Sequence, residues 1–115
     1  MEIAMYQMEN KLWICVPEEL DQYAADIIRR KCEIIFMDQE RKHIIFDFSK
    51  TTFMDSGGIG MILGRLRQQQ AMGGLLFIYK PGKRMVHLIK ISGLMRYVII
   101  CEREDQIDAK LEEMK

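Results

Sequence analysis

The sequence predicts a small α/β protein in which four helices cover a mixed β-sheet, in the order β-β-α-β-α-β-α-β-α. Short apolar runs of strand length alternate with longer segments that repeat apolar residues at helical spacing. Only two residues separate the first two runs, which predicts an antiparallel hairpin. Helical segments separate the later runs, which predicts parallel strand pairs joined by right-handed crossovers.

The first half of the chain holds the hairpin, one helix and one buried strand. Residues 3–8 and 11–16 form the hairpin around a two-residue turn. Asp21 is a suitable N-cap for a helix over residues 22–38. Residues 43–48 are almost wholly apolar, which is typical of a strand buried on both faces. The buried face of the helix is predicted to carry Ala24, Ile27, Ile28, Cys32 and Ile35.

The second half of the chain adds three helices and two strands after a loop at residues 49–55. In order, they are a helix over 56–70, a strand at 75–79, a helix over 83–91, a strand at 97–101 and a helix over 104–114. Glycines after the first two of these helices end them, as C-cap glycines do. Met61 and Arg65 are expected to lie off the apolar face of the first helix, which is predicted to be Ile59, Ile62, Leu63 and Leu66.

Length and composition limit the class of protein. The chain has 115 residues, about the length of one domain, so we expect a single domain over residues 1–115. Hydrophobic residues make up 49% and charged residues 30%, as in globular proteins, and no apolar run approaches the ~20 residues that span a bilayer. Three widely spaced cysteines without a CxxC motif predict free thiols in a reducing cytoplasm.

The net charge is zero, but the charge is unevenly distributed. Residues 56–101 contain seven basic and no acidic residues, whereas residues 1–55 and 102–115 are net acidic. No lysine- or arginine-rich block with interleaved aromatic residues accompanies this excess. We therefore expect a mixed surface after folding, with neither a nucleic-acid interface nor a membrane interface.

Residues 46–64, FDFSKTTFMDSGGIGMILG, contain the most informative motif. Ser56 begins a helix after a strand and a loop, where free backbone N–H groups favour an anion such as a phosphate. Glycines at 57, 58 and 60 remove side-chain bulk, so that another protein can reach the Ser56 hydroxyl. The alternative is that Ser56 is only an N-cap and that the glycines only permit tight packing. The residues by themselves favour this alternative.

The segment Asp55-Ser56-Gly57-Gly58-Ile59-Gly60 resembles the signature of STAS domains, specifically of anti-sigma factor antagonists of the SpoIIAA type. Glu19-Leu20-Asp21 and Ile91-Ser92-Gly93-Leu94 resemble two further segments of that family, so the resemblance covers nearly the whole chain. It implies the STAS fold and favours an accessible Ser56. The sequence departs from the family at Gly57, where close relatives often have a second hydroxyl residue.

The resemblance implies a regulatory binding module rather than an enzyme, acting on transcription in sporulation or a stress response. It implies that an anti-sigma factor with serine kinase activity phosphorylates Ser56, and that a serine phosphatase resets it. Unphosphorylated protein would bind the anti-sigma factor and so release a sigma factor. Asp55 would position the hydroxyl or the partner's Mg-ATP, while Asp21 would contact the partner or only cap its helix. The expected partner-binding residues are Asp21, Met54, Asp55, Gly57, Gly58, Met61 and Arg65.

Two other functions stay open on the sequence. A STAS module can serve another assembly, such as a stress-signalling scaffold or a lipid-transport complex, although Ser56 and a stand-alone chain favour the antagonist. An enzyme with a cofactor at the start of the Ser56 helix is the more distant alternative. The glycines at 58, 60 and 64 miss the dinucleotide fingerprint, and no GxxxxGK[ST] loop occurs. We expect no cofactor and no metal, and interpret His43 and His87 as structural or surface residues.

Overall fold

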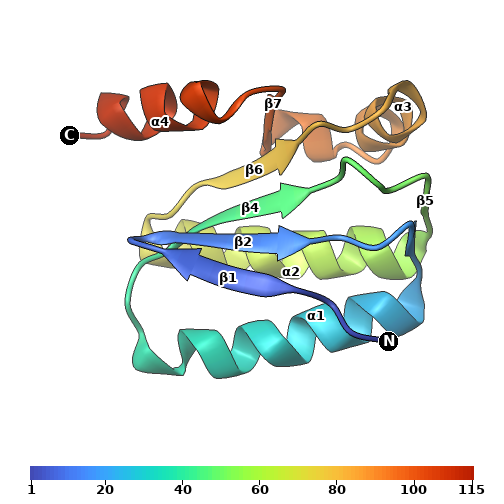
Figure 1. The fold of residues 1–115 in the computed structure, drawn as a ribbon, viewed down its shortest axis with the longest axis horizontal. Coiled ribbons are helices and arrows are strands. Elements are labelled where there is room, and N and C mark those ends of the chain that lie inside the picture. The colour runs from blue at the N-terminus through green and yellow to red at the C-terminus, as the bar shows by residue number, and fades with distance from the viewer.

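The computed structural model describes all of residues 1–115, and a five-stranded sheet forms its centre (Figure 1). The first strand pairs antiparallel with the second, and all other neighbours are parallel. The predicted opening hairpin and mixed sheet are therefore confirmed. In spatial order the strands are β1 (Met5–Met8), β2 (Lys11–Cys15), β4 (His43–Asp47), β6 (Leu76–Tyr79) and β7 (Ile99–Cys101).

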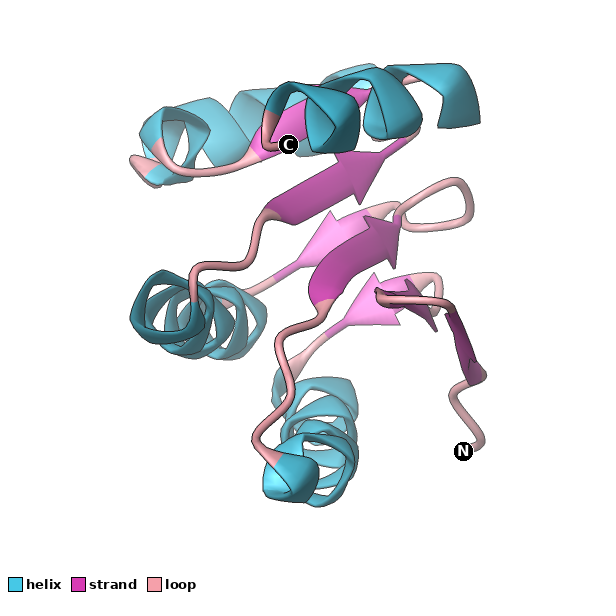
Figure 2. Cartoon of the chain, turned by 90° about the vertical axis from the view of Figure 1, so that its left-hand side faces the viewer, coloured by secondary structure: helices cyan, strands magenta, loops and turns pink.

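Helices cover the two faces of this sheet unequally, as the turned view of Figure 2 shows. The helices are α1 (Gln22–Ile35), α2 (Ser56–Met72), α3 (Lys83–Ile91) and α4 (Glu104–Glu113). Residues of α1, α2 and α3 belong to a cluster of 23 buried apolar residues on one face. On the other face, α4 contributes Ile107 to a cluster of only five buried residues.

Successive residues of each strand point to opposite faces, and this alternation feeds both clusters. Leu12 and Ile44 are paired in register and belong to the larger cluster. The next pair, Trp13 and Ile45, belongs to the smaller one. The central strands are therefore apolar on both faces, which is why they read as continuous apolar runs in the sequence.

Several predicted boundaries differ from the observed ones by one to three residues, and a 3-10 helix accounts for two of these differences. The first helix ends at Ile35 and passes into a 3-10 helix, η1 (Phe36–Asp38), rather than continuing to residue 38. Before β7, residues Leu94–Arg96 form a second 3-10 helix, η2, after Gly93 with its left-handed φ of 82°. This turn delays the start of the last strand from residue 97 to Ile99.

A second, two-stranded sheet lies where the sequence predicted only loops. It pairs β3 (Glu19–Leu20) with β5 (Phe53–Met54) in parallel. Each of these short strands comes directly before a helix, β3 before α1 and β5 before α2. The small sheet therefore sets where these two helices begin.

Candidate functional site

The small β3–β5 sheet places the starts of α1 and α2 next to each other. Leu20 pairs with Met54 in it, and both side chains are buried. Thr51 fixes the loop before β5, because its hydroxyl lies within hydrogen-bonding distance of the carbonyl oxygens of Val16 and Pro17, at 3.3 and 3.0 Å. The two helices consequently begin at the ends of the same two-stranded sheet.

An aspartate caps each of these helices. Oδ1 of Asp21 accepts a hydrogen bond from the backbone N–H of Ala24 at 2.9 Å, and Oδ1 of Asp55 accepts one from Gly58 at 3.1 Å. Asp21 therefore has the capping role that was one of its two expected roles. The cap of α2 is Asp55 and not Ser56, so the alternative in which Ser56 serves only as an N-cap is wrong.

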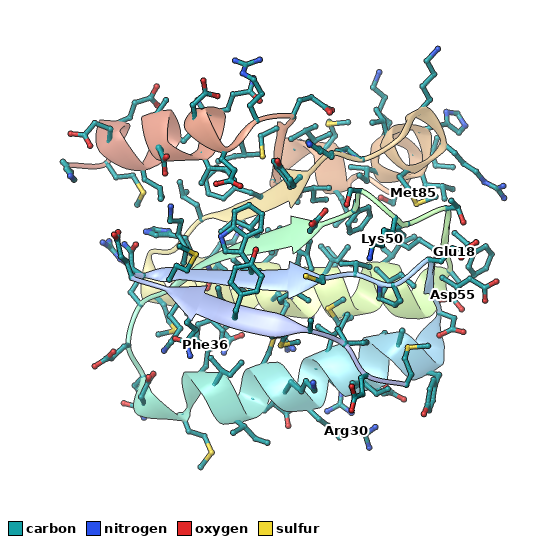
Figure 3. The ribbon with its side chains drawn as sticks, in the orientation of Figure 1. Glu18, Arg30, Phe36, Lys50, Asp55 and Met85 are labelled. Carbon is teal, nitrogen blue, oxygen red and sulfur yellow. The ribbon has the colours of Figure 1, made fainter.

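Ser56 is the first residue of α2 and is exposed. Its hydroxyl makes no hydrogen bond within the chain, because the Asp55 carboxylate already occupies the capping position. Figure 3 labels Asp55 at one end of the molecule, together with Glu18 and Lys50. The hydroxyl that the sequence singled out is thus accessible at this end.

The glycines after Ser56 have different surroundings. A Cβ atom at Gly57 would lie 2.5 Å from Oε1 and 2.9 Å from Cα of Gln22, and one at Gly58 would lie 2.6 Å from the carbonyl oxygen of Leu20. These two glycines permit the close approach of α2 to α1 and β3. Of the glycines at 57, 58 and 60, only Gly60 leaves open space, since a Cβ there would meet nothing within 4 Å. The tight-packing interpretation is therefore right for two glycines and the open-surface interpretation for the third.

A groove of about 250 Å³ runs between α1 and α2 beside Ser56. Ser56 and three α2 residues form one side of the groove, and four α1 residues form the other. The lining residues are Gln22, Ala25, Asp26, Arg29, Ser56, Gly57, Gly60 and Met61. The carboxylate of Asp26 accepts a hydrogen bond from Nε2 of Gln22 at 2.9 Å, so the α1 side of the groove is ordered by its own side chains.

Three of the expected partner-binding residues, Met54, Gly58 and Met61, are buried instead of lying on the surface. Met54 is 4% exposed and Met61 is 5% exposed, and both belong to the larger cluster. The expectation that Met61 lies off the buried face is wrong, because α2 packs with a different set of residues inward. That set is Gly58, Met61, Ile62, Leu66 and Gln69.

Arg65 is half-buried between α1 and α2 rather than on an open surface. Its Nε and Nη1 atoms are buried without a hydrogen-bond partner. The guanidinium faces Cys32 of α1. Burial raises the pKa of the Cys32 thiol to about 11, although the charge of Arg65 opposes this rise. Part of the Arg65 guanidinium is thus enclosed in the contact between α1 and α2.

The residues that sequence reasoning missed belong to α1 and β5. Gln22, Asp26 and Arg29 line the groove, and their spacing puts them on one helical face, a signal that the sequence contained. Tyr23 and Phe53 are 57% and 39% exposed, and each lies within three residues of a helix start. Aromatic side chains of this kind are enriched at the centres of protein interfaces.

Other polar groups form no comparable site. No group of three or more His, Cys, Asp or Glu side chains is close enough to hold a metal ion. None of the helices combines the length and the apolar character that crossing a membrane requires. His43 is buried, and its Nδ1 accepts a hydrogen bond from the backbone N–H of Leu75 at 3.0 Å, so it ties strand β4 to the segment before β6.

Comparison with known proteins relates this arrangement to one family. The sequence model of the STAS domain matches residues 2–113. An anti-sigma F factor antagonist of Lysinibacillus sphaericus is 32% identical over 90 residues, which are 78% of this chain and 77% of the relative. Another, from Paenibacillus polymyxa, is 27% identical over 112 residues, or 97% and 96% of the two chains.

Solved structures agree with this relationship. SpoIIAA, an anti-sigma factor antagonist, in its unphosphorylated form superposes with a TM-score of 0.83 at 27% identity, covering 96% of this chain and 97% of that one. The phosphorylated form of SpoIIAA, described as a Bacillus cell fate determinant, superposes with a TM-score of 0.75 at 28% identity, covering 94% and 98%.

Proposed function

The chain belongs to the STAS domain family, and we propose that it acts as an anti-sigma factor antagonist whose binding is switched by phosphorylation of Ser56. In this proposal residues 1–115 form one domain, which works by binding and not by catalysis. The unphosphorylated protein sequesters an anti-sigma factor and thereby releases a sigma factor. The observation that carries the proposal is the exposed Ser56 hydroxyl, which is left free because Asp55 caps α2.

The partner supplies the chemistry of the switch. An anti-sigma factor with serine kinase activity transfers the γ-phosphoryl group of Mg-ATP to Oγ of Ser56. A bond forms between Oγ and the phosphorus, the bond to the leaving ADP breaks, and the hydroxyl proton is released. A serine phosphatase later hydrolyses the phosphate ester. This chain contributes the acceptor and the surface that surrounds it.

The phosphate changes the surface more than the fold. It adds about −1.5 to −2 charges at pH 7 to an end of the molecule that already carries Asp21, Asp26 and Asp55. Inside the chain it is tolerated, because Ser56 is exposed and helix N-termini favour anions. The cost of the added charge therefore falls on any partner pressed against Ser56.

The partner surface includes the expected residues with accessible atoms, namely Asp21, Asp55, Gly57 and Arg65, all half-buried. We extend it to the exposed aromatic residues Tyr23 and Phe53 and to the groove at Gly60. Met54, Met61 and Gly58 support this surface from beneath. The three cysteines are free, which fits a reducing compartment, and we place the protein in the cytoplasm.

Incubation of the chain with its anti-sigma factor and Mg-ATP tests the proposal. We expect one phosphate at Ser56 by mass spectrometry, none on Ser56→Ala, and an undiminished yield on Ser49→Ala. Ser49 is a suitable control because it is also exposed but lies in the loop after β4. Phosphate at another residue, or none on the unaltered chain, would contradict the proposal.

Binding of the same partner tests the switch separately. Isothermal titration should give similar affinities for Ser56→Ala and the unaltered chain, and an affinity at least about tenfold lower for Ser56→Asp, equivalent to ~1.4 kcal/mol. Gln70→Glu adds a similar charge at an exposed position near the far end of α2 and should bind normally. Equal affinities for all four proteins would remove the switch.

A further inference from the structure

Arg29 lines the same groove as Ser56, on the opposite helix. Its guanidinium Nη1 contacts Oε1 of Glu33 at 2.9 Å, and its Nη2 lies 3.9 Å from Oδ1 of Asp26. The Arg29 side chain is 45% exposed, and ion pairs at such exposure contribute little to stability. The two carboxylates therefore position the Arg29 guanidinium in the groove, but these ion pairs contribute little free energy.

The path between Arg29 and Ser56 is open. The Arg29 guanidinium lies between Glu33, toward the C-terminus of α1, and Asp26, toward the start of α1. That start lies against Gly57, the neighbour of Ser56, because a Cβ at Gly57 would come within 2.9 Å of the Gln22 backbone. On the α2 side, Gly60 places no side chain in the groove.

We propose that Arg29 binds the phosphate on Ser56 and so serves as the intramolecular phosphate receptor of the switch; this rests on the proposed function. A phosphate of nearly two charges competes better for the guanidinium than the single charge of Asp26 or Glu33 does. The planar guanidinium can also donate two parallel hydrogen bonds to phosphate oxygens. On phosphorylation Arg29 leaves its carboxylate partners and turns toward position 56.

The charged groups around the phosphate favour this contact. Asp21 and Asp55 cap the two adjoining helices, and Asp26 lies in the groove itself. All three carboxylates repel the phosphate, and Arg29 is the cation among the groove residues. Once bound to the phosphate, Arg29 spans the groove and covers the surface that the partner would contact. Binding is then lost although the fold stays the same.

The test uses the chain of residues 1–115 with phosphoserine incorporated at position 56 during translation, so that no kinase is needed. The second pKa of the phosphate is measured by 31P NMR titration in the unaltered chain, Arg29→Gln and Arg30→Gln. Arg30 is a matched control, since it is exposed, makes no ion pair and points away from α2 at the lower edge of Figure 3. The helix N-terminus and the two capping carboxylates, Asp21 and Asp55, act alike in all three proteins.

We expect the second phosphate pKa to be at least about half a unit higher in Arg29→Gln than in the unaltered chain, and unchanged in Arg30→Gln. In the unaltered chain the Nε–H resonance of Arg29, but not that of Arg30, should shift as the phosphate titrates. Equal pKa values in all three proteins, or a silent Arg29 resonance, would overturn the role of Arg29.

Partner binding separates this inference from the proposed function. If phosphoserine at position 56 weakens binding of the anti-sigma factor while the Arg29→Gln pKa is unchanged, the switch stands and Arg29 is excluded. If Arg29→Gln raises the phosphate pKa but phosphoserine leaves binding of the anti-sigma factor intact, Arg29 is the phosphate receptor and the proposed function is wrong. If both hold, phosphorylated Arg29→Gln should bind the partner more tightly than phosphorylated unaltered protein.

Discussion

The four glycines of α2 differ in what a side chain would meet at each position. At Gly57 and Gly58 a Cβ would come within 3.0 Å of the backbone of Gln22 or Leu20, whereas at Gly60 and Gly64 it would meet nothing within 4 Å. A helical glycine costs roughly 0.5–1 kcal/mol relative to alanine. Close packing requires glycine at positions 57 and 58 despite this cost. No neighbouring atom requires glycine at positions 60 and 64.

Alanine substitution should therefore change stability in opposite directions within one helix. Gly58→Ala should lower the free energy of unfolding by about 1–3 kcal/mol, because the added methyl group forces β3 and α2 apart. Gly60→Ala and Gly64→Ala should raise it by roughly 0.5–1 kcal/mol. Urea unfolding measures all three. Equal stability of Gly58→Ala and Gly60→Ala would contradict the close approach.

Gly60→Ala also separates stability from binding. Its methyl group projects into the groove beside Ser56, whereas that of Gly64→Ala, one turn later, does not line the groove. We expect Gly60→Ala to be more stable than the unaltered chain but to bind the anti-sigma factor less tightly, by titration calorimetry. If Gly64→Ala weakens binding as much, the groove is not the contact surface.

At the level of elements, the sequence predicted those helices and strands whose pattern of apolar residues extends over several residues. The strands β4 and β6 could be predicted because their apolar runs are continuous, and α1 because its apolar residues repeat over several turns. The pair β3–β5 could not, since two residues carry no periodicity and their partners lie 34 positions apart. The buried face of α2 was misassigned because glycine at 57 and 58 turns that side toward α1 and β3.

The candidate site shows the same division between features that a local segment reveals and features that depend on tertiary contacts. Ser56 was singled out by the resemblance of its segment to the STAS signature, but the α1–α2 groove depends on the tertiary contact of Gly57 with Gln22. A motif within one segment cannot reveal such a contact. The spacing of Asp26 and Arg29 places them on one face of α1, but only the packing of α1 against α2 shows that this face lies beside Ser56.

His43 joins two elements through a pH-sensitive contact. It is buried at the start of β4, and its Nδ1 accepts the hydrogen bond from Leu75 only while that nitrogen is unprotonated. Burial, helped by the charge of Arg41, lowers the pKa of His43 below its ordinary 6.5. Between the two values the unfolded chain binds more protons, so stability falls as the pH drops below about 6.5.

His43→Asn should remove this part of the pH dependence. The Oδ1 atom of asparagine can accept the hydrogen bond from Leu75 but cannot be protonated, so the unfolding free energy should change less between pH 7.5 and 5 than in the unaltered chain. His87→Asn, at an exposed position, should keep the original dependence. Urea unfolding at several pH values measures both. An unchanged slope in His43→Asn would exclude this role.

On the scale of the whole molecule, the two sheet faces are stabilised very differently. Three helices and 23 buried residues cover the face beneath Ser56, whereas the opposite face depends on α4 and a cluster of five. That smaller cluster includes Trp13, which stacks on Tyr6 at 6.0 Å and meets Tyr79 edge-on at 5.3 Å. The site is therefore built on the better-packed side, away from the sparsely covered one.

Two neighbouring residues of α4 show which force holds it to the sheet. Ile107 is 1% exposed in the smaller cluster, while Asp108 pairs with Lys11 at 3.0 Å with 64% of its side chain exposed. Ile107→Ala should cost about 2–4 kcal/mol through lost burial and a cavity. Asp108→Asn should cost less than ~1 kcal/mol, because exposed ion pairs are weak.

Fluorescence of Trp13, the only tryptophan, can follow this difference during urea unfolding. Because Ile107 belongs to the same buried cluster as Trp13, Ile107→Ala should also let water reach the indole and change its emission in the native state. Asp108→Asn should leave that emission unchanged. Phosphorylation of Ser56 in either variant should proceed as in the unaltered chain, since α4 packs on the opposite face. Loss of phosphorylation in Ile107→Ala, with the fold retained, would show that the two faces are coupled.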